Sequence, residues 1–339
     1  MIHLRIVVPN HQAENALELL DSTQSVCNLI YLQGAARRPE GDVILCDVSR
    51  RDASVVIADL RELDIDEEGS IAMEEIDSEI SRAGAEAEGK KRLGDIDPVV
   101  WEELDSRTHE SVELSASFLL FMVLAMLIAS VGIYFNQPIL IVAAMVVGPE
   151  FGPISGACVA IVSREPELAK RSLLALAIGF PLGTFVAFLA TVFFDAIGQL
   201  PDTINFETHT LTRFIAQPDM FSLYIAVIAG VVGMISLTAS KSSALVGVLI
   251  SVTTIPAAAN MGVAAAYGDW VTVRGAAIQL GVNLAGIFAA GLLTLYVQRL
   301  IYVRRRHAHL HDESRKIAGL PVGSSRRRRV DPAEEVDAF

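Results

Sequence analysis

One apolar stretch decides the fold: residues 139–162 read ILIVAAMVVGPEFGPISGACVAIV. It is long enough to cross a hydrocarbon core, which needs about 20 residues. Two Gly-Pro pairs, Gly148-Pro149 and Gly152-Pro153, lie in its middle. Because proline removes a backbone donor and clashes with the preceding turn, the pattern predicts two half-helices that meet near mid-bilayer. Exposed backbone at that depth is tolerable only where it is buried in protein or lines a wet cavity.

Apolar segments of similar length lie on both sides of this stretch. The six segments that we expect to span the membrane run approximately over residues 114–135, 139–163, 172–198, 221–239, 243–267 and 273–300. The fifth reads SALVGVLISVTTIPAAANMGVAAAY and carries Pro256 in its middle, so it is a second candidate for a broken helix. The sequence therefore predicts an α-helical polytopic membrane protein with six transmembrane helices.

The two broken segments occupy matching places in the two halves of the core. A shift of 103 residues brings Pro153 onto Pro256, and each broken segment has one plain segment on either side. Since three crossings are an odd number, the second half would be upside down relative to the first, which gives two inverted three-helix repeats. Small residues of period four, which we expect to form packing faces, follow each broken segment: Ala175, Gly179, Gly183, Ala187, then Ala277, Gly281, Ala285, Ala289.

Charge is segregated along the chain. Residues 1–113 carry a net charge of −15, residues 114–298 carry −2, and residues 299–339 carry +4. This distribution excludes a single soluble domain and a disordered chain. The cysteines, Cys27, Cys46 and Cys158, are odd in number and form no CxxC pair, so they exclude a disulfide scaffold. We expect an acidic soluble head, a nearly uncharged membrane core and a basic tail.

The arginine clusters predict the orientation of the core. Arg304–Arg306 and Arg326–Arg329 place the tail in the cytoplasm, and six crossings then place the head there too. The N-terminus has no apolar run typical of a signal peptide. We therefore expect a multi-pass protein of the cell membrane with both termini cytoplasmic. If segments 139–163 and 243–267 instead re-entered, the basic loop residues Arg164, Lys170, Arg171 and Lys241 would move outside, against the positive-inside rule.

The head, residues 1–76, has the pattern of a small α+β module. Strands are predicted at 2–8, 25–32, 42–48 and 69–76, with a loop at 34–41, and helices should follow Asn10, a candidate N-cap, and Ser49. The order β-α-β-β-α-β is the ferredoxin-like arrangement. Its acidity argues against nucleic acid as a partner. Residues 77–113 should form a linker and a juxtamembrane helix, and residues 304–339 a disordered basic cytosolic tail.

Glu150 is the foremost candidate for chemistry. It lies between the two Gly-Pro pairs and is the only acid between Glu113 and Glu165. A carboxylate in mid-membrane costs roughly 2.5–3.5 kcal/mol on insertion scales, so such a residue is rarely kept without a function. A half-helix starting at Pro153 would point its positive end at it. Glu150 could bind a cation, relay a proton or pair with a basic group, or it could be merely solvated near the surface.

The second broken segment offers neutral polar groups at the matching place. These are Ser251, Thr253 and Thr254 before Pro256, then Asn260, with Gln279 and the deeper Asn283 in the last segment. They could bind an ion or small polar solute, or serve ordinary interhelical hydrogen bonding. The predicted site for a solute or ion thus comprises Glu150, Gly148, Pro149, Gly152, Pro153, Thr253, Thr254, Pro256, Asn260 and Asn283.

No motif for catalysis, nucleotide binding or a cofactor is present in the sequence. Walker A, GxSxG, HExxH and paired-carboxylate patterns are all lacking, so we expect neither an enzyme nor a cofactor. The alternating His307, His309 and His311 sit in a basic tail and are expected to be solvated, and the acids of the Asp64–Glu68 turn likewise, so we expect no metal site.

The stretch Ile141–Gly156, with its Ala144-Met145 pair and the Pro149–Pro153 break, carries a family resemblance. Together with the following basic loop and small-residue helix, it resembles the bacterial and archaeal membrane family known as Domain of Unknown Function 389. The resemblance covers roughly residues 110–300. It implies the membrane fold and a small N-terminal cytosolic domain, but no activity, and a glutamate at position 150 is not a general feature of that family.

Two functions are compatible with these features. The first is a secondary transporter or channel-like carrier of a small solute or ion, with its site at the two broken helices and a head that regulates or oligomerises. The alternative is a membrane-anchored metabolite sensor or scaffold without transport. The expected partners are the lipid bilayer, a small solute or ion and further copies of the chain.

Overall fold

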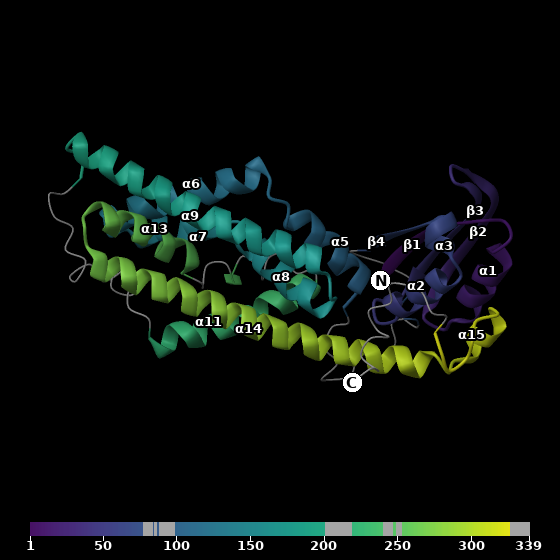
Figure 1. Cartoon of the computed structure of the whole chain (residues 1–339). Coiled ribbons are helices and arrows are strands. Elements are labelled where there is room, and N and C mark those ends of the chain that lie inside the picture. The colour runs from purple at the N-terminus through teal and green to yellow at the C-terminus, as the bar shows by residue number, and fades with distance from the viewer. Residues whose placement is uncertain are drawn as a thin grey trace. The chain divides into compact units, whose positions relative to one another are not determined.

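The computed structural model describes residues 1–76, 84, 87, 99–200, 219–239, 247–248 and 253–325, and only the backbone of residues 313 and 314. The chain forms two compact units. The first comprises Met1–Leu104 with Gln298–Phe339, and the second comprises Asp105–Val297. The described part of the chain is mostly helical and has one small sheet, which lies in the first unit (Figure 1).

The sheet of the first unit has four antiparallel strands in the order β2-β3-β1-β4. The strands are β1 (Ile2–Val8), β2 (Val26–Arg37), β3 (Glu40–Val48) and β4 (Ser70–Glu75). β1 alternates as predicted, because Ile2, Leu4 and Ile6 are buried in a core shared with helices α1 (Ala13–Ser22) and α2 (Ala53–Glu62). The predicted order β-α-β-β-α-β is observed, with a short additional helix α3 (Ile65–Glu68) before β4.

Two local predictions for the head are wrong. The expected loop at 34–41 is instead part of a long hairpin, because β2 continues to Arg37. The pairing of β2 with β3 shifts register between Leu32 and Ala36, and Gly34, at φ +61°, lies within that irregularity. Asn10 does not cap α1, which begins three residues later behind Gln12 and has no side-chain cap. Asp66 in the acidic turn pairs with Arg61 at 3.0 Å, as expected of a partly solvated charged turn.

The C-terminal residues of the first unit also differ from the prediction. Helix α14 (Trp270–His309) continues well past residue 300, and α15 (Glu313–Ile317) follows it. Ala318 and Leu320 then enter the hydrophobic core of the head. A disordered tail from residue 304 is therefore wrong as far as residue 325. Residues 326–339, and the predicted linker over 77–98 apart from 84 and 87, lie outside the described residues.

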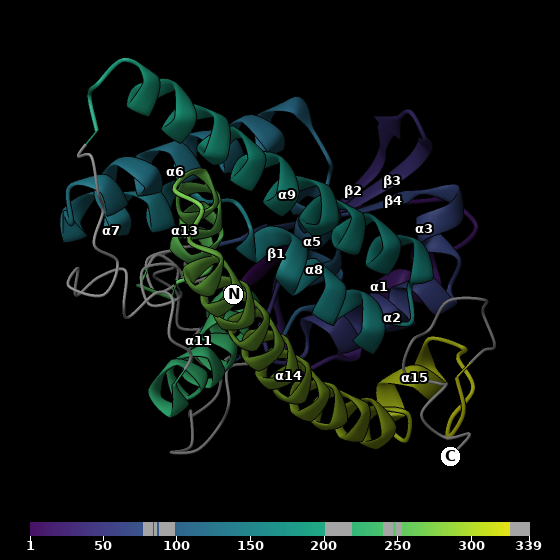
Figure 2. The ribbon, with the colours of Figure 1, turned by 60° about the vertical axis from the view of Figure 1, so that its left-hand side comes forward.

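Figure 2 shows the helices from a second direction. Those not yet named are α5 (Trp101–Ser111), α6 (Ala116–Tyr134), α7 (Pro138–Val147), α8 (Phe151–Val162), α9 (Pro166–Ala196), α11 (Met220–Thr238) and α13 (Thr254–Ala266). Among the described residues, four helices, α6, α9, α11 and α14, are long and apolar enough to cross a membrane, and the bent pair α7–α8 makes five spans if it counts as one. Large apolar side chains on them are exposed, among them Phe121 and Phe185. Exposed apolar surface of this extent fits a membrane-embedded protein.

The two predicted small-residue faces behave differently. Ala175, Gly179, Gly183 and Ala187 are buried, and the two glycines admit Met122 and Met126 of α6, so the first packing face is confirmed. Gly281, Ala285 and Ala289 of α14 are exposed in the described part of this chain, so the second packing face is not confirmed. The helix instead turns Gln279, Asn283 and Gly286 inward, because the two amides find polar partners there and Gly286 lets α11 approach.

The second predicted broken segment is only partly described. Ser251 and most of residues 240–252 lie outside the described residues, whereas α13 is complete. Ten of its thirteen residues are buried, and the helix packs against α6, α7 and α9. α13 is therefore an interior helix, surrounded by protein along most of its length.

Candidate functional site

The break between α7 and α8 is where the sequence placed it, with a bend of 45° between the two helices. α7 ends at Gly148, whose backbone is extended, and Pro149 and Glu150 lead into α8, which begins at Phe151. The half-helix that was expected to start at Pro153 starts two residues earlier, at Phe151. Pro153 is the third residue of α8, where a backbone N–H would have no partner within the helix, so proline fits there without interrupting it.

Glu150 is almost completely buried, with 4% of its surface exposed. Its Oε1 accepts a hydrogen bond of 2.7 Å from the Thr254 hydroxyl, and its Oε2 has no hydrogen-bond partner among the described residues. Gly148 makes room for this arrangement, because a Cβ there would collide with Glu150 Oε2 and lie 2.7 Å from Ile255 Cγ1. The solvated alternative for Glu150 is therefore wrong.

Thr254 is the first residue of α13, just as Phe151, next to Glu150, is the first residue of α8. Pro256 is the third residue of α13, as Pro153 is of α8. The hydrogen bond between Glu150 and Thr254 thus joins the N-terminal ends of two short buried helices. Each end presents backbone N–H groups without helical partners and a partial positive charge, and the Glu150 carboxyl group lies where the two ends meet.

A row of neutral polar side chains adjoins this point. Asn283 Nδ2 donates to Thr253 Oγ1 at 3.0 Å, and Gln279 Nε2 donates to Asn283 Oδ1 at 3.3 Å. Asn260 is fully buried, and neither atom of its amide has a hydrogen-bond partner among the described residues. Because buried polar atoms are nearly always paired, Glu150 Oε2 and the Asn260 amide are groups that a proton, an ion or a polar solute could satisfy.

The structure does not bring every predicted residue to this point. A Cβ at Gly152 would lie 2.9 Å from the Ser111 carbonyl oxygen, so this glycine serves close packing against the end of α5. Pro149, Pro153 and Pro256 shape the backbone without offering a donor. The polar groups that hydrogen bonds link at or next to this point are thus Glu150, Thr254, Thr253 and Asn283, with Gln279 next to them, whereas Asn260 lies further along α13.

The sequence reasoning missed a buried ionic cluster in the first unit. It consists of Asp59 and Glu62 on α2, Arg306 and His309 on α14, and Arg315 on α15. Asp59 accepts hydrogen bonds from Arg306, Arg315 and His309, the last at 2.8 Å, and Arg315 also reaches Glu62 at 2.7 Å. His309 was expected to be solvated, and that expectation is wrong. The available signal was two acids, one turn apart, within the apolar helix α2.

The charges of this cluster stabilise one another. Burial raises the pKa of Asp59, but the hydrogen bond from His309 and the charges of Arg306 and Arg315 outweigh it and leave that pKa below its usual value. Burial lowers the pKa of Arg306, and Asp59 and Glu62 more than compensate, so that pKa is raised. The cluster therefore ties the end of α14 and α15 to helix α2.

These observations define a class: a helical, membrane-embedded protein with a broken helix, a buried carboxylate at the break and a small α+β head. Residues 145–289 match the model of a family described as domain of unknown function (DUF389), which confirms the resemblance carried by Ile141–Gly156. An uncharacterized protein of Methanocaldococcus jannaschii is 28% identical over 165 residues, which are 48% of each chain. The chain thus spans about half the length of this curated relative. No solved structure matches it at a significant level.

Proposed function

We propose that this chain is a secondary transporter or channel-like carrier of a small solute or ion, with its site at the starts of α8 and α13. The observation that carries the proposal is the buried hydrogen bond between Glu150 and Thr254, beside polar atoms that have no partner among the described residues. In transporters, paired broken helices with N-terminal ends at mid-membrane are the usual place for a substrate or coupling ion. A buried intramembrane carboxylate is by default a functional residue.

The chemistry of the site favours a proton or a small cation at Glu150. Helix N-terminal ends attract anions, but here the Glu150 carboxylate already supplies one. Its unpaired Oε2 and the neutral oxygens of Thr253, Asn260 and Asn283 offer the hard oxygen ligands that alkali and alkaline-earth ions prefer. Loading Glu150 with a proton or cation would weaken its attraction to the two helix ends. The site thereby couples its occupancy to the contact between α8 and α13.

We further propose six crossings arranged as two inverted repeats. Support comes from the equivalent starts of α8 and α13, 103 residues apart, each with proline as its third residue. The basic residues of the predicted loops favour cytoplasmic termini in the cell membrane. In a chain without native cysteines, Lys170→Cys should react with an impermeant maleimide only from the cytoplasmic side. Labelling from outside would support re-entrant hairpins instead.

Transport can be tested with purified protein in proteoliposomes on a solid-supported membrane. Concentration jumps of H⁺, Na⁺, K⁺ and Cl⁻ should give a transient current for at least one ion. We expect Glu150→Gln to reduce it at least tenfold, because a neutral amide cannot exchange a proton or balance a cation. Glu167→Gln, an exposed glutamate at the start of α9, is the control and should retain the current. Equal currents in both variants would refute the proposed site.

The sensor alternative has one observation in its favour. A surface hollow of the head is lined by Asn10, Glu14, Tyr31 and Asp42, among others, and Asp42 holds the Tyr31 hydroxyl and the Gly34 N–H at 2.7 Å. A ligand-induced thermal shift of the full chain that is lost in Asp42→Asn, with no current for any of the four ions, would favour this alternative.

A further inference from the structure

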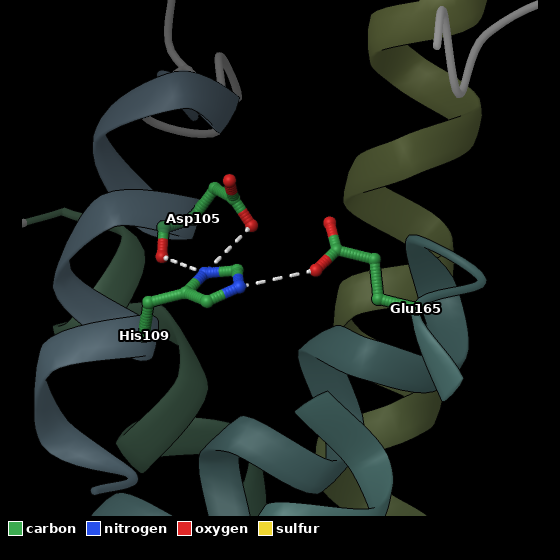
Figure 3. Close-up of side chains that lie close together, drawn as sticks. All are labelled: Asp105, His109 and Glu165. Carbon is green, nitrogen blue, oxygen red and sulfur yellow. Dashed lines mark hydrogen bonds and ion pairs between the residues drawn. The ribbon is translucent and has the colours of Figure 1, made fainter. Parts of the chain in front are cut away.

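Three metal-ligating side chains outside the proposed transport site lie together in the second unit. Asp105 and His109 are one turn apart on α5, and Glu165 immediately precedes α9 (Figure 3). One ligand atom of each lies within 4.8 Å of those of the other two. All three side chains are between one third and one half exposed, so dissolved ions can reach them.

The backbone fixes the positions of the three groups. Asp105 and His109 share one face of α5 through their spacing of four residues. Glu165 is held by the end of α8, where Arg164 adopts a left-handed conformation at φ +56° and the Glu165 N–H donates to the Ala160 carbonyl at 2.8 Å. Two separate elements therefore bring a carboxylate to each ring nitrogen of His109, Asp105 to Nδ1 and Glu165 to Nε2 (Figure 3).

The hydrogen bonds of His109 show which of its ring nitrogens can face a bound cation. Its Nδ1 lies 3.0 Å from the Asp105 backbone carbonyl, which can only accept, so Nδ1 carries a hydrogen. In the neutral ring Nε2 then presents a lone pair, and it faces Glu165 Oε2 at 3.3 Å. The position between Nε2 and Oε2 therefore suits a cation, either a proton carried by Nε2 or a metal ion that both atoms bind. A hydrogen bond from Nδ1 to a carbonyl is also the usual way in which a metal-bound histidine is oriented.

The distances suit a metal ion. With metal–nitrogen and metal–oxygen bonds of about 2.0–2.2 Å, neighbouring ligand atoms around a tetrahedral ion are separated by roughly 3.4 Å. The 3.3 Å between Nε2 and Glu165 Oε2 is close to this value. Asp105 Oδ1 is buried at the atom level, accepts no hydrogen bond from the described residues and lies 3.4 Å from Nδ1. Because a ligand atom of Asp105 lies within 4.8 Å of those of His109 and Glu165, Asp105 can supply a further ligand.

We propose that Asp105, His109 and Glu165 form a binding site for a divalent transition-metal cation. One imidazole and two carboxylates suit Zn²⁺, Mn²⁺, Fe²⁺ or Co²⁺, and water completes the coordination. The ion joins α5 to the start of α9, the helix that packs along α13. The site is distinct from the buried Glu150 site, and its occupancy would stabilise this part of the second unit.

The test uses the full chain in detergent, purified with a cleavable tag that contains no histidine and stripped with a chelator. Co²⁺ is the probe, because its visible absorption reports the ligand set. We expect saturable binding of about one equivalent, without the near-ultraviolet band that thiolate ligands produce. His109→Gln, Glu165→Gln and Asp105→Asn should each raise the Kd at least tenfold. Metal should raise the Tm of the wild type, and these variants should lose that shift while keeping the metal-free Tm.

Two matched controls make the result specific. Glu110→Gln changes an exposed neighbour on α5 and should bind Co²⁺ as the wild type does. His307→Gln/His311→Gln removes two tail histidines, and it should leave the first equivalent unchanged. Absence of saturable binding, a thiolate band, or equal binding by the three site variants would overturn the proposal. Absence of binding would instead assign a proton to the position between His109 and Glu165.

Discussion

The Thr254 hydroxyl donates a hydrogen bond of 2.7 Å to Glu150 Oε1, although 104 positions separate the two residues in the sequence. The bond joins the first turn of α13 to the residue that precedes α8. It supplies a polar partner to a carboxylate that is otherwise surrounded by helix ends and apolar side chains. The stability of the break should therefore depend on this hydroxyl.

Thr254→Val keeps the shape of the side chain but removes the donor. Leaving a buried acceptor unpaired costs roughly 1–3 kcal/mol, and more for a charged group. We expect a lower Tm in detergent for this variant. Thr294→Val is the matched control, because its hydroxyl bonds only to the Ala290 carbonyl of its own helix. If the two variants lowered the Tm equally, the hydrogen bond to Glu150 would contribute no more to stability than one within a helix.

Gly148→Ala should disturb Glu150 without changing any polar group. The added Cβ would collide with Oε2 and press on Ile255, so the carboxylate or α13 must shift. Overpacking of this kind costs typically about 1–3 kcal/mol. Gly281→Ala adds the same methyl group to α14, where nothing lies within 4 Å, and should be neutral or slightly stabilising. A fully stable Gly148→Ala variant with unchanged ion currents would show that the geometry at the break is not critical.

Arg315 is completely buried and bonds to both Asp59 and Glu62. Arg315→Met should leave two buried carboxylates with fewer partners, at a cost of about 3–5 kcal/mol to the free energy of unfolding of the first unit. Trp101, one of two tryptophans, lies in that unit beneath the Arg299 guanidinium at 4.9 Å. Its fluorescence in a Trp270→Phe background reports the loss. Lys316→Met, at an exposed neighbour, should unfold as the parent does.

Sequence reasoning located the break and its carboxylate because both depend on local rules. Proline next to glycine in the middle of an apolar segment favours an interruption of the helix, and a lone glutamate in an apolar run is conspicuous. The same reasoning placed the start of the second half-helix at Pro153, two residues too late, since proline is harmless at several positions of a helix's first turn.

Two features that the sequence did not predict, the buried face of α14 and the buried ionic cluster, depend on tertiary contacts. The face of α14 that is buried is set by Thr253, which engages Asn283, and the small residues on the other side are left exposed. Likewise, the sequence alone assigns Arg306 and His309 to a solvated basic tail, because it does not show that both contact Asp59. A local charge pattern indicates only whether a segment is charged on average. A buried ion pair depends on contacts between residues some 250 positions apart in the sequence.

The ionic cluster also predicts how the first unit responds to acid. The pKa of Asp59 is lower in the folded chain than its usual value, because His309, Arg306 and Arg315 favour the charged form. Its contribution to stability is thus complete above the unfolded pKa of about 3.9, and it is lost as the pH falls through the lower, folded pKa. The contribution should be constant from neutral pH down to about pH 5, and below that Asp59 should add up to about 1.4 kcal/mol per pH unit to the slope.

Asp59→Asn tests this dependence directly, because the amide cannot ionise. The variant should be less stable at pH 7, and its free energy of unfolding should fall less steeply between pH 5 and pH 3 than that of the parent. Denaturant titrations followed by Trp101 fluorescence in the Trp270→Phe background give both quantities. Asp66→Asn, which removes a half-exposed carboxylate paired with Arg61, should keep the parental slope. Equal slopes for Asp59→Asn and the parent would mean that acid acts on the first unit through other carboxylates.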